Sequence, residues 1–234
     1  MTTGLTILIP VDVSGDVSVS PGMREIVDNE TVVLLGYYPV PEQAAPAQIR
    51  EKEEAAADRR LAALAERFDD PTTVLVFTGD QDETVDRVAN EHGCDAVLTP
   101  GGAVPDRVER ILVALRGETN LGRIVSVVGD LLADSGAGVT LFHAETGSSD
   151  LGELVLRGAA DKLAETGVTR DRVDWHLAAG SDATAAIADT AGEYDLVVLG
   201  ESEPSLRERI FGAVPGDVTE RIDRPTLVVR DVTA

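Results

Sequence analysis

Apolar runs separated by helical patterns organise the whole chain. Runs rich in Val, Leu and Ile are bounded by Gly, Pro, Asp or Asn, which is typical of buried strands. The predicted strands cover residues 5–11, 31–38, 72–78, 95–99, 109–115, 138–143, 172–178, 196–199 and 226–229. Between several of them, apolar residues recur at helical spacing. This alternation predicts an α/β fold with parallel strands flanked by helices.

Two of the intervening segments carry a clear helical pattern. Apolar side chains at positions i, i+3, i+4 and i+7 form one stripe on a helix, and such a stripe can cover a sheet face. The first set is Leu61, Leu64, Ala65 and Phe68. The second set is Leu121, Ile124, Val128 and Leu131, in which one spacing departs from this pattern. We therefore expect sheet-covering helices at both places.

The chain also contains an internal repeat. Asp82, Thr84, Asp95 and Val97 recur 100 positions later as Asp182, Thr184, Asp195 and Val197, in the same order of predicted elements. The GAVP of 102–105 recurs at 212–215, which is ten residues further on. The second copy therefore has an insertion close to ESEPSLRERI, at the carboxyl end of a strand, where open α/β sheets bind ligands.

The repeat predicts two units, residues 1–107 and residues 108–234. The first unit has no counterpart of the inserted loop. It also lacks an obvious fifth strand, since 104–111 leads into a segment that fits better as the first strand of the second unit. We expect the first unit to be a truncated copy, with one sheet edge left to be covered.

Composition limits the class of protein. No apolar stretch approaches the eighteen residues of a membrane span, and the N-terminus has no basic region followed by an apolar one. The single cysteine, Cys94, excludes an internal disulfide, and the three histidines are too scattered for a zinc pattern. We expect a cytoplasmic protein that is not inserted in a membrane.

The charge balance is strongly acidic. The chain has 42 Asp and Glu residues against 20 Lys and Arg residues, a formal net charge of −22. A nucleic-acid partner is disfavoured because no basic stripe is visible. The acidic excess is spread through every segment, which is typical of a solvated surface suited to high salt, where self-repulsion is screened. The sequence therefore indicates a halophilic cytoplasm.

In five segments, the sequence resembles the universal stress protein family, in a tandem-domain, haloarchaeal-like form. The resemblance depends on the order of ILIPVDVS (7–14), ERILVALRGE (109–118), VTLFHAET (139–146), YDLVVLGESEPSLRERIFGAV (194–214) and PTLVVRD (225–231). It implies five-stranded parallel sheets flanked by helices, and pairing between two such domains. It also implies, in members that bind ATP, an acidic residue ending strand one, a small residue contacting adenine and a glycine-rich phosphate loop.

The second unit matches this site only in part. Gly200 and Gly212 match the first and third loop glycines, whereas Glu203 replaces the second, and the following spacer is one residue short. Ala213 replaces a hydroxyl residue. The resemblance assigns the site to Arg116 at the strand-one acidic position, Ala144 at the adenine contact, and Gly200, Ser202, Gly212, Ala213 and Val214 in the loop.

These departures predict a degenerate nucleotide or anion site. Glu203 restricts the backbone and places a carboxylate near the phosphates, and loss of the hydroxyl removes an anion donor. Arg116, Arg207 and Arg209 would offset part of this if they face inward. In the alternative, Arg207 and Arg209 pair with Glu201, Glu203 or Glu208. The first copy keeps an acid at Asp12 but has no loop.

The predicted function is a regulatory module whose second unit binds ATP or another adenine nucleotide weakly or not at all. The alternative is a ligand-free interaction or scaffold module that regulates a partner such as a membrane transporter. An enzyme is the least favoured class, because no base, nucleophile or metal cluster accompanies the loop. The expected partners are the chain itself, as an intramolecular pseudo-dimer or a homodimer, and another protein.

Overall fold

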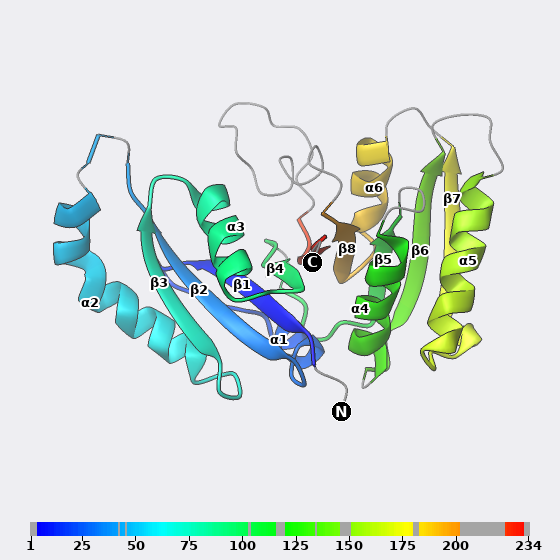
Figure 1. Cartoon of the computed structure of the whole chain (residues 1–234), viewed down its shortest axis with the longest axis horizontal. Coiled ribbons are helices and arrows are strands. Elements are labelled where there is room, and N and C mark those ends of the chain that lie inside the picture. The colour runs from blue at the N-terminus through cyan, green and yellow to red at the C-terminus, as the bar shows by residue number, and fades with distance from the viewer. Residues whose placement is uncertain are drawn as a thin grey trace.

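A computed structural model describes residues 4–41, 43–44, 46–102, 104–115, 120–133, 135–145, 151–179, 183–201 and 223–231. Within these residues, nine strands form one continuous sheet in the order β3-β2-β1-β4-β9-β8-β5-β6-β7 (Figure 1). The strands are β1 (Thr6–Asp12), β2 (Thr31–Pro39), β3 (Thr72–Thr78), β4 (Ala96–Thr99), β5 (Arg110–Ala114), β6 (Gly138–Glu145), β7 (Val173–Ala179), β8 (Leu196–Gly200) and β9 (Thr226–Val229).

Every strand predicted from an apolar run is present, with its ends shifted by at most two residues. The α/β class with a mostly parallel sheet is therefore confirmed. The segment 109–115, which separates the two sequence copies, forms β5. Its hydrogen-bonded neighbours are β6 and β8, so it lies among the strands of the second copy.

Two sets of parallel strands meet in the middle of the sheet. Strands β1 to β4 run parallel to one another, as do β5 to β9, and the sets join through the antiparallel pair β4 and β9. β9 is also parallel to β8. It therefore covers the edge of β4 that the first copy leaves open. The described residues between β4 and β5 contain no strand that could do so.

Helices cover both faces of this sheet. The helices are α1 (Pro21–Ile26), α2 (Pro46–Ala65), α3 (Gln81–Glu91), α4 (Leu121–Ala133), α5 (Leu151–Glu165) and α6 (Ala183–Ala191), with a 3-10 turn at Arg170–Arg172. Buried residues of α1, α2, α4 and α5 share one core that runs across both sets of strands. α3 and α6 each cover a separate core on the opposite face. Among the helices so described, none has the length and apolarity that a bilayer crossing demands.

The helical stripes predicted from sequence face the core, except that α2 ends at Ala65, so Phe68 of the first stripe follows the helix and packs against the core from there. Leu61 and Leu64 of α2 are buried, as are Ile124, Val128 and Leu131 of α4. Helix starts are fixed locally: the Ser20 side chain accepts from the Met23 amide at α1, and Asp80 accepts from the Glu83 amide at α3. Such caps satisfy amides that have no partner within the helix.

The two copies use their repeated aspartates in the same way. The Asp95 carboxylate accepts from the Thr6 amide at 2.8 Å, at the start of β1. The Asp195 carboxylate accepts from the Arg110 amide at 2.9 Å, at the start of β5. The aspartate amides donate back to the Thr6 and Arg110 carbonyls at 2.7 and 2.9 Å. Each aspartate, which immediately precedes β4 or β8, thus ties the start of that strand to the start of the first strand of its set.

Candidate functional site

The structure describes two of the seven residues that the sequence assigns to the site. Ala144 lies in β6 and Gly200 ends β8. The other five, Arg116, Ser202, Gly212, Ala213 and Val214, lie outside the described residues, as does Glu203. The described part of the candidate site is therefore the carboxyl edge of the second set of strands, without most of the loop.

Ala144 and Gly200 lie at the same edge of the sheet. β6 and β8 are parallel and flank β5 on either side, so both residues lie at carboxyl ends. Two strand spacings of about 4.8 Å separate them across the sheet, or roughly 10 Å. This separation suits a ligand that is recognised at two points, and the carboxyl edge is where open α/β sheets bind ligands.

Small side chains surround Ala144. Ala144 pairs with Ala178 of the neighbouring β7, and both contact the core beneath α6, as do Ala186 and Tyr194. Ala144, Ala178 and Ala186 are each only partly buried. The three alanines, which come from β6, β7 and α6, form one apolar surface, here called the alanine floor. Sequence reasoning missed Ala178 and Ala186, because alanine in a strand or helix has no signature that separates a site from ordinary packing.

His143, next to Ala144, supports the strand end. Its Nδ1 lies 2.8 Å from the Leu115 carbonyl oxygen, so this nitrogen donates and links β6 to the residue after β5. A Cβ at Gly152 would lie 2.7 Å from the His143 ring, which shows how closely the start of α5 packs here. The ring faces the α5 side of the sheet, away from the alanine floor, and its contacts give it a structural role.

Glu201, the first residue of the inserted loop, is held by the end of β9. Its carboxylate accepts from the Asp231 amide at 2.7 Å and pairs with the Arg230 Nε at 3.5 Å. The Arg230 side chain is 9% exposed and that of Glu201 is 19% exposed. The sequence left open a pairing of Glu201 with Arg207 or Arg209, which lie outside the described residues. Among the described residues, Arg230 pairs with Glu201, and its charge offsets that of Glu201.

Arg230 also reaches the first copy. Its guanidinium donates to the Asn90 side chain of α3 at 3.0 Å, and its amide donates to the Asp95 carbonyl at 2.9 Å. Asp95 in turn pairs with Arg123 of α4 at 2.7 Å. Cys94 is buried beside this cluster, and burial raises the pKa of its thiol to about 11. A reactive thiolate is not favoured there.

The carboxyl edge of the first set carries different chemistry. Asp12 ends β1 and pairs in register with Tyr37 of β2. Burial raises the pKa of the Tyr37 phenol to about 12, and the carboxylates of Asp12 and Asp82 act in the same direction. The phenol also makes a side-chain hydrogen bond with Gln81, in the first turn of α3. Tyr37 therefore lies between the end of β1 and the start of α3.

This environment predicts a titration above the ordinary tyrosine range. The unfolded chain loses the Tyr37 proton near pH 10 and the folded chain near pH 12. The Tyr37 contribution to stability is therefore intact below pH 10 and is lost as the pH rises to about 12. Phenolate absorbance of the wild type should show this late ionisation, and Tyr37→Phe should remove it. Superimposable titrations of the two proteins would contradict the assignment.

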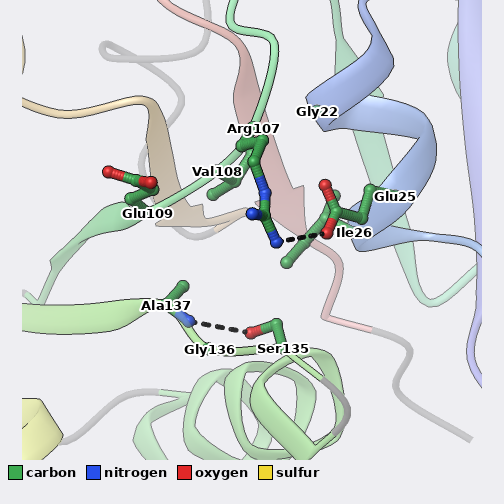
Figure 2. Close-up of a pocket in the computed structure, with 9 residues that line it drawn as sticks. All are labelled: Gly22, Glu25, Ile26, Arg107, Val108, Glu109, Ser135, Gly136 and Ala137. Atoms are coloured by element: carbon green, nitrogen blue, oxygen red, sulfur yellow. Dashed lines mark hydrogen bonds and ion pairs between the residues drawn. The ribbon is translucent and has the colours of Figure 1, made fainter.

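A pocket of about 400 Å³ lies at a different place, where α1 meets the start of β5 and the turn before β6 (Figure 2). Arg107 points toward Glu25 and pairs with it at 3.2 Å, and both side chains are exposed. The pocket is at the amino ends of β5 and β6, so it is separate from the candidate site. Within the described residues, no group of three His, Cys, Asp or Glu side chains could hold a metal ion.

Comparison with known proteins identifies the fold. No protein-family model and no curated protein sequence matches the chain. A universal stress protein from Archaeoglobus fulgidus has a similar structure, with a TM-score of 0.60, 13% identity and 96% of each chain covered. A protein of unknown function from Pseudomonas aeruginosa gives 0.55 and 16% identity, covering 97% of this chain and 92% of its own.

A shorter solved structure, a universal stress protein in complex with cAMP, covers 53% of this chain and 97% of its own. Its identity is 25% and its TM-score is 0.43. The two longer structures cover nearly the whole of this chain. This chain therefore has the universal stress protein fold.

Proposed function

We propose that this chain is a universal-stress-type regulatory module in tandem form, with a degenerate nucleotide or anion site in its second unit. Similarity of fold over 96% of the chain to a universal stress protein supports this assignment. The proposed units are residues 1–107 and 108–234. Their shared sheet supports the intramolecular pseudo-dimer, in which β9 closes the edge that the first unit leaves open.

The alanine floor is the observation that favours the second unit as the binding half. Ala144, Ala178 and Ala186 present small, partly buried apolar side chains at the carboxyl edge of the sheet, which would suit contact with a flat apolar group. Gly200 lies at the same edge, two strands away, where the inserted loop begins. An adenine ring over the alanines, with phosphates toward Gly200, is the arrangement that the resemblance implies.

Affinity for ATP is proposed to be weak or absent. Glu203 and Ala213 replace a glycine and a hydroxyl residue in the family loop, and Arg116 replaces the strand-one acid. The described contacts reduce one further obstacle to phosphate binding, the charge of Glu201. Glu201 is paired with Arg230, so its charge opposes phosphates less than a fully solvated carboxylate would. The remaining obstacles are the Glu203 carboxylate and its restriction of the loop backbone, the lost hydroxyl donor at Ala213, and Arg116 in place of the acid.

Calorimetry with ATP and Mg²⁺ in molar KCl tests this proposal. We expect no measurable binding, or a Kd in the millimolar range, corresponding to about 4 kcal/mol or less of binding free energy. Restoring the family residues in Glu203→Gly with Ala213→Ser should tighten binding at least about tenfold. Adding Ala144→Tyr to that double variant should abolish the gain. Micromolar binding by the wild type would overturn the proposed degeneracy.

The alternative is a ligand-free interaction or scaffold module that regulates a partner such as a membrane transporter. It would be supported if the restored loop still failed to bind any adenine nucleotide. The proposed role is non-enzymatic, and loss of ATP during the calorimetric incubation would contradict that. The acidic surface, with a formal charge of −22, supports a proposed setting in a high-salt cytoplasm.

A further inference from the structure

The strand registers reveal which residues of the two copies are equivalent. Ile7 of β1 pairs with Val32 on one side and Ala96 on the other. Ile111 of β5 pairs in the same way with Val139 and Leu196. Counting along the second strand of each set from these pairs places Tyr37 at the position of Ala144.

The neighbours of this position follow the same correspondence. Tyr37 pairs with Val76 of β3, and Ala144 pairs with Ala178 of β7. Tyr37 follows Val33 and Leu35 on the face that α3 covers, whereas Ala144 contacts the core beneath α6. Both side chains therefore face the same side of the sheet. One copy has an aromatic ring where the other has a methyl group.

The surroundings of Tyr37 hold its ring in this place. The ring is half-buried, and its hydroxyl is hydrogen-bonded to Gln81 in the first turn of α3. Asp12 and Asp82 lie close enough for their charges to act on the phenol. A phosphate approaching this edge would meet two carboxylates, which repel it. The first copy thus differs from the second in shape and in charge.

We propose that Tyr37 closes the first copy's counterpart of the candidate site with its own ring, so that one chain accepts a single planar ligand. The inference rests on the proposed function for the second copy. It adds a specificity-determining residue that is independent of the loop. The missing loop alone would weaken phosphate binding, whereas Tyr37 excludes the ring of the ligand itself.

Adenosine is the probe for this inference, because it carries the ring and no phosphate for Asp12 and Asp82 to repel. Calorimetry and thermal shift would compare the wild type with Tyr37→Ala and Tyr37→Phe. The wild type should take up at most one adenosine per chain. Tyr37→Ala should bind a second adenosine, with a Kd at least about tenfold lower than that of any binding by the wild type at the first copy. Tyr37→Phe keeps the ring and should gain none.

Ala144→Tyr is the matched change in the other copy and should abolish binding there. If the wild type binds nothing while Tyr37→Ala binds adenosine, the closure by Tyr37 stands, and the second copy has lost adenine binding entirely, which is the lower limit of its proposed degeneracy. Two adenosines bound per wild-type chain would overturn the closure. A folded Tyr37→Ala with no gain would do the same. If Tyr37→Ala does not fold, Tyr37→Val should give the same result, because valine favours a strand more than alanine does.

Discussion

Replacement of Gly101 by alanine should lower the free energy of unfolding by about 3 kcal/mol, the upper part of the range for overpacking. A Cβ at Gly101 would lie 2.6 Å from the Arg224 carbonyl oxygen and 2.7 Å from the Pro225 nitrogen. Both contacts are backbone atoms immediately before β9, so no side-chain rotation relieves them. The segment would have to move, and β9 joins the two sets of strands.

Urea unfolding in molar KCl would measure this loss. Gly15→Ala is the control, because a Cβ at the exposed Gly15 would have no neighbour within 4 Å. We expect that variant to lie within about 0.5 kcal/mol of the wild type, as other surface substitutions do. A loss below about 1 kcal/mol for Gly101→Ala, with an unchanged denaturant slope, would show that the start of β9 can shift without disturbing the junction.

The strands could be predicted from sequence because each is a short apolar run between turn residues. β8 and β9 lie in the middle of the sheet and are buried throughout, so both strands consist mainly of Val and Leu. The helices α2 and α4 were likewise evident from their apolar stripes. These patterns depend only on residues that are close together in the sequence, and such patterns are enough to predict the fold class.

The position of β9 between β4 and β8 was not predictable in the same way. Its antiparallel pairing with β4 joins residues 96–99 to residues 226–229, and nothing in either segment specifies the direction of the partner. The sequence did indicate an uncovered edge in the first copy. It did not indicate that the final strand of the second copy would cover that edge.

The equivalence of Tyr37 and Ala144 escaped the sequence comparison for a definite reason. The repeat was found at an offset of 100, which holds for the residues around Asp95 and Asp195. Loops of different length shift the first strands to an offset of 104 and the second strands to 107, as Ile7 with Ile111 and Tyr37 with Ala144 show. A single offset cannot align all of these elements, whereas the registers do so directly.

Replacement of Arg230 by methionine should lower the free energy of unfolding by about 2–3 kcal/mol. Removing one member of a buried pair costs about 3–5 kcal/mol, because the other charge stays behind without compensation. The lower figure applies here because Glu201 keeps some access to water, with 19% of its side chain exposed. The Asn90 side chain also loses its donor from Arg230. Methionine retains most of the buried hydrophobic stem.

A double-mutant cycle separates the ion pair from the rest of the loss. Glu201→Gln in the wild type removes the same pair from the other side, and in Arg230→Met it removes a carboxylate whose pair with Arg230 is already gone. If the two charges interact as the structure indicates, the double variant should be more stable than the sum of the single losses predicts, by about 1 kcal/mol. Additive losses would mean that Arg230 acts through Asn90 and packing alone. In that case the Glu201 carboxylate would gain nothing from the nearby Arg230 guanidinium, and the predicted ATP affinity would fall further.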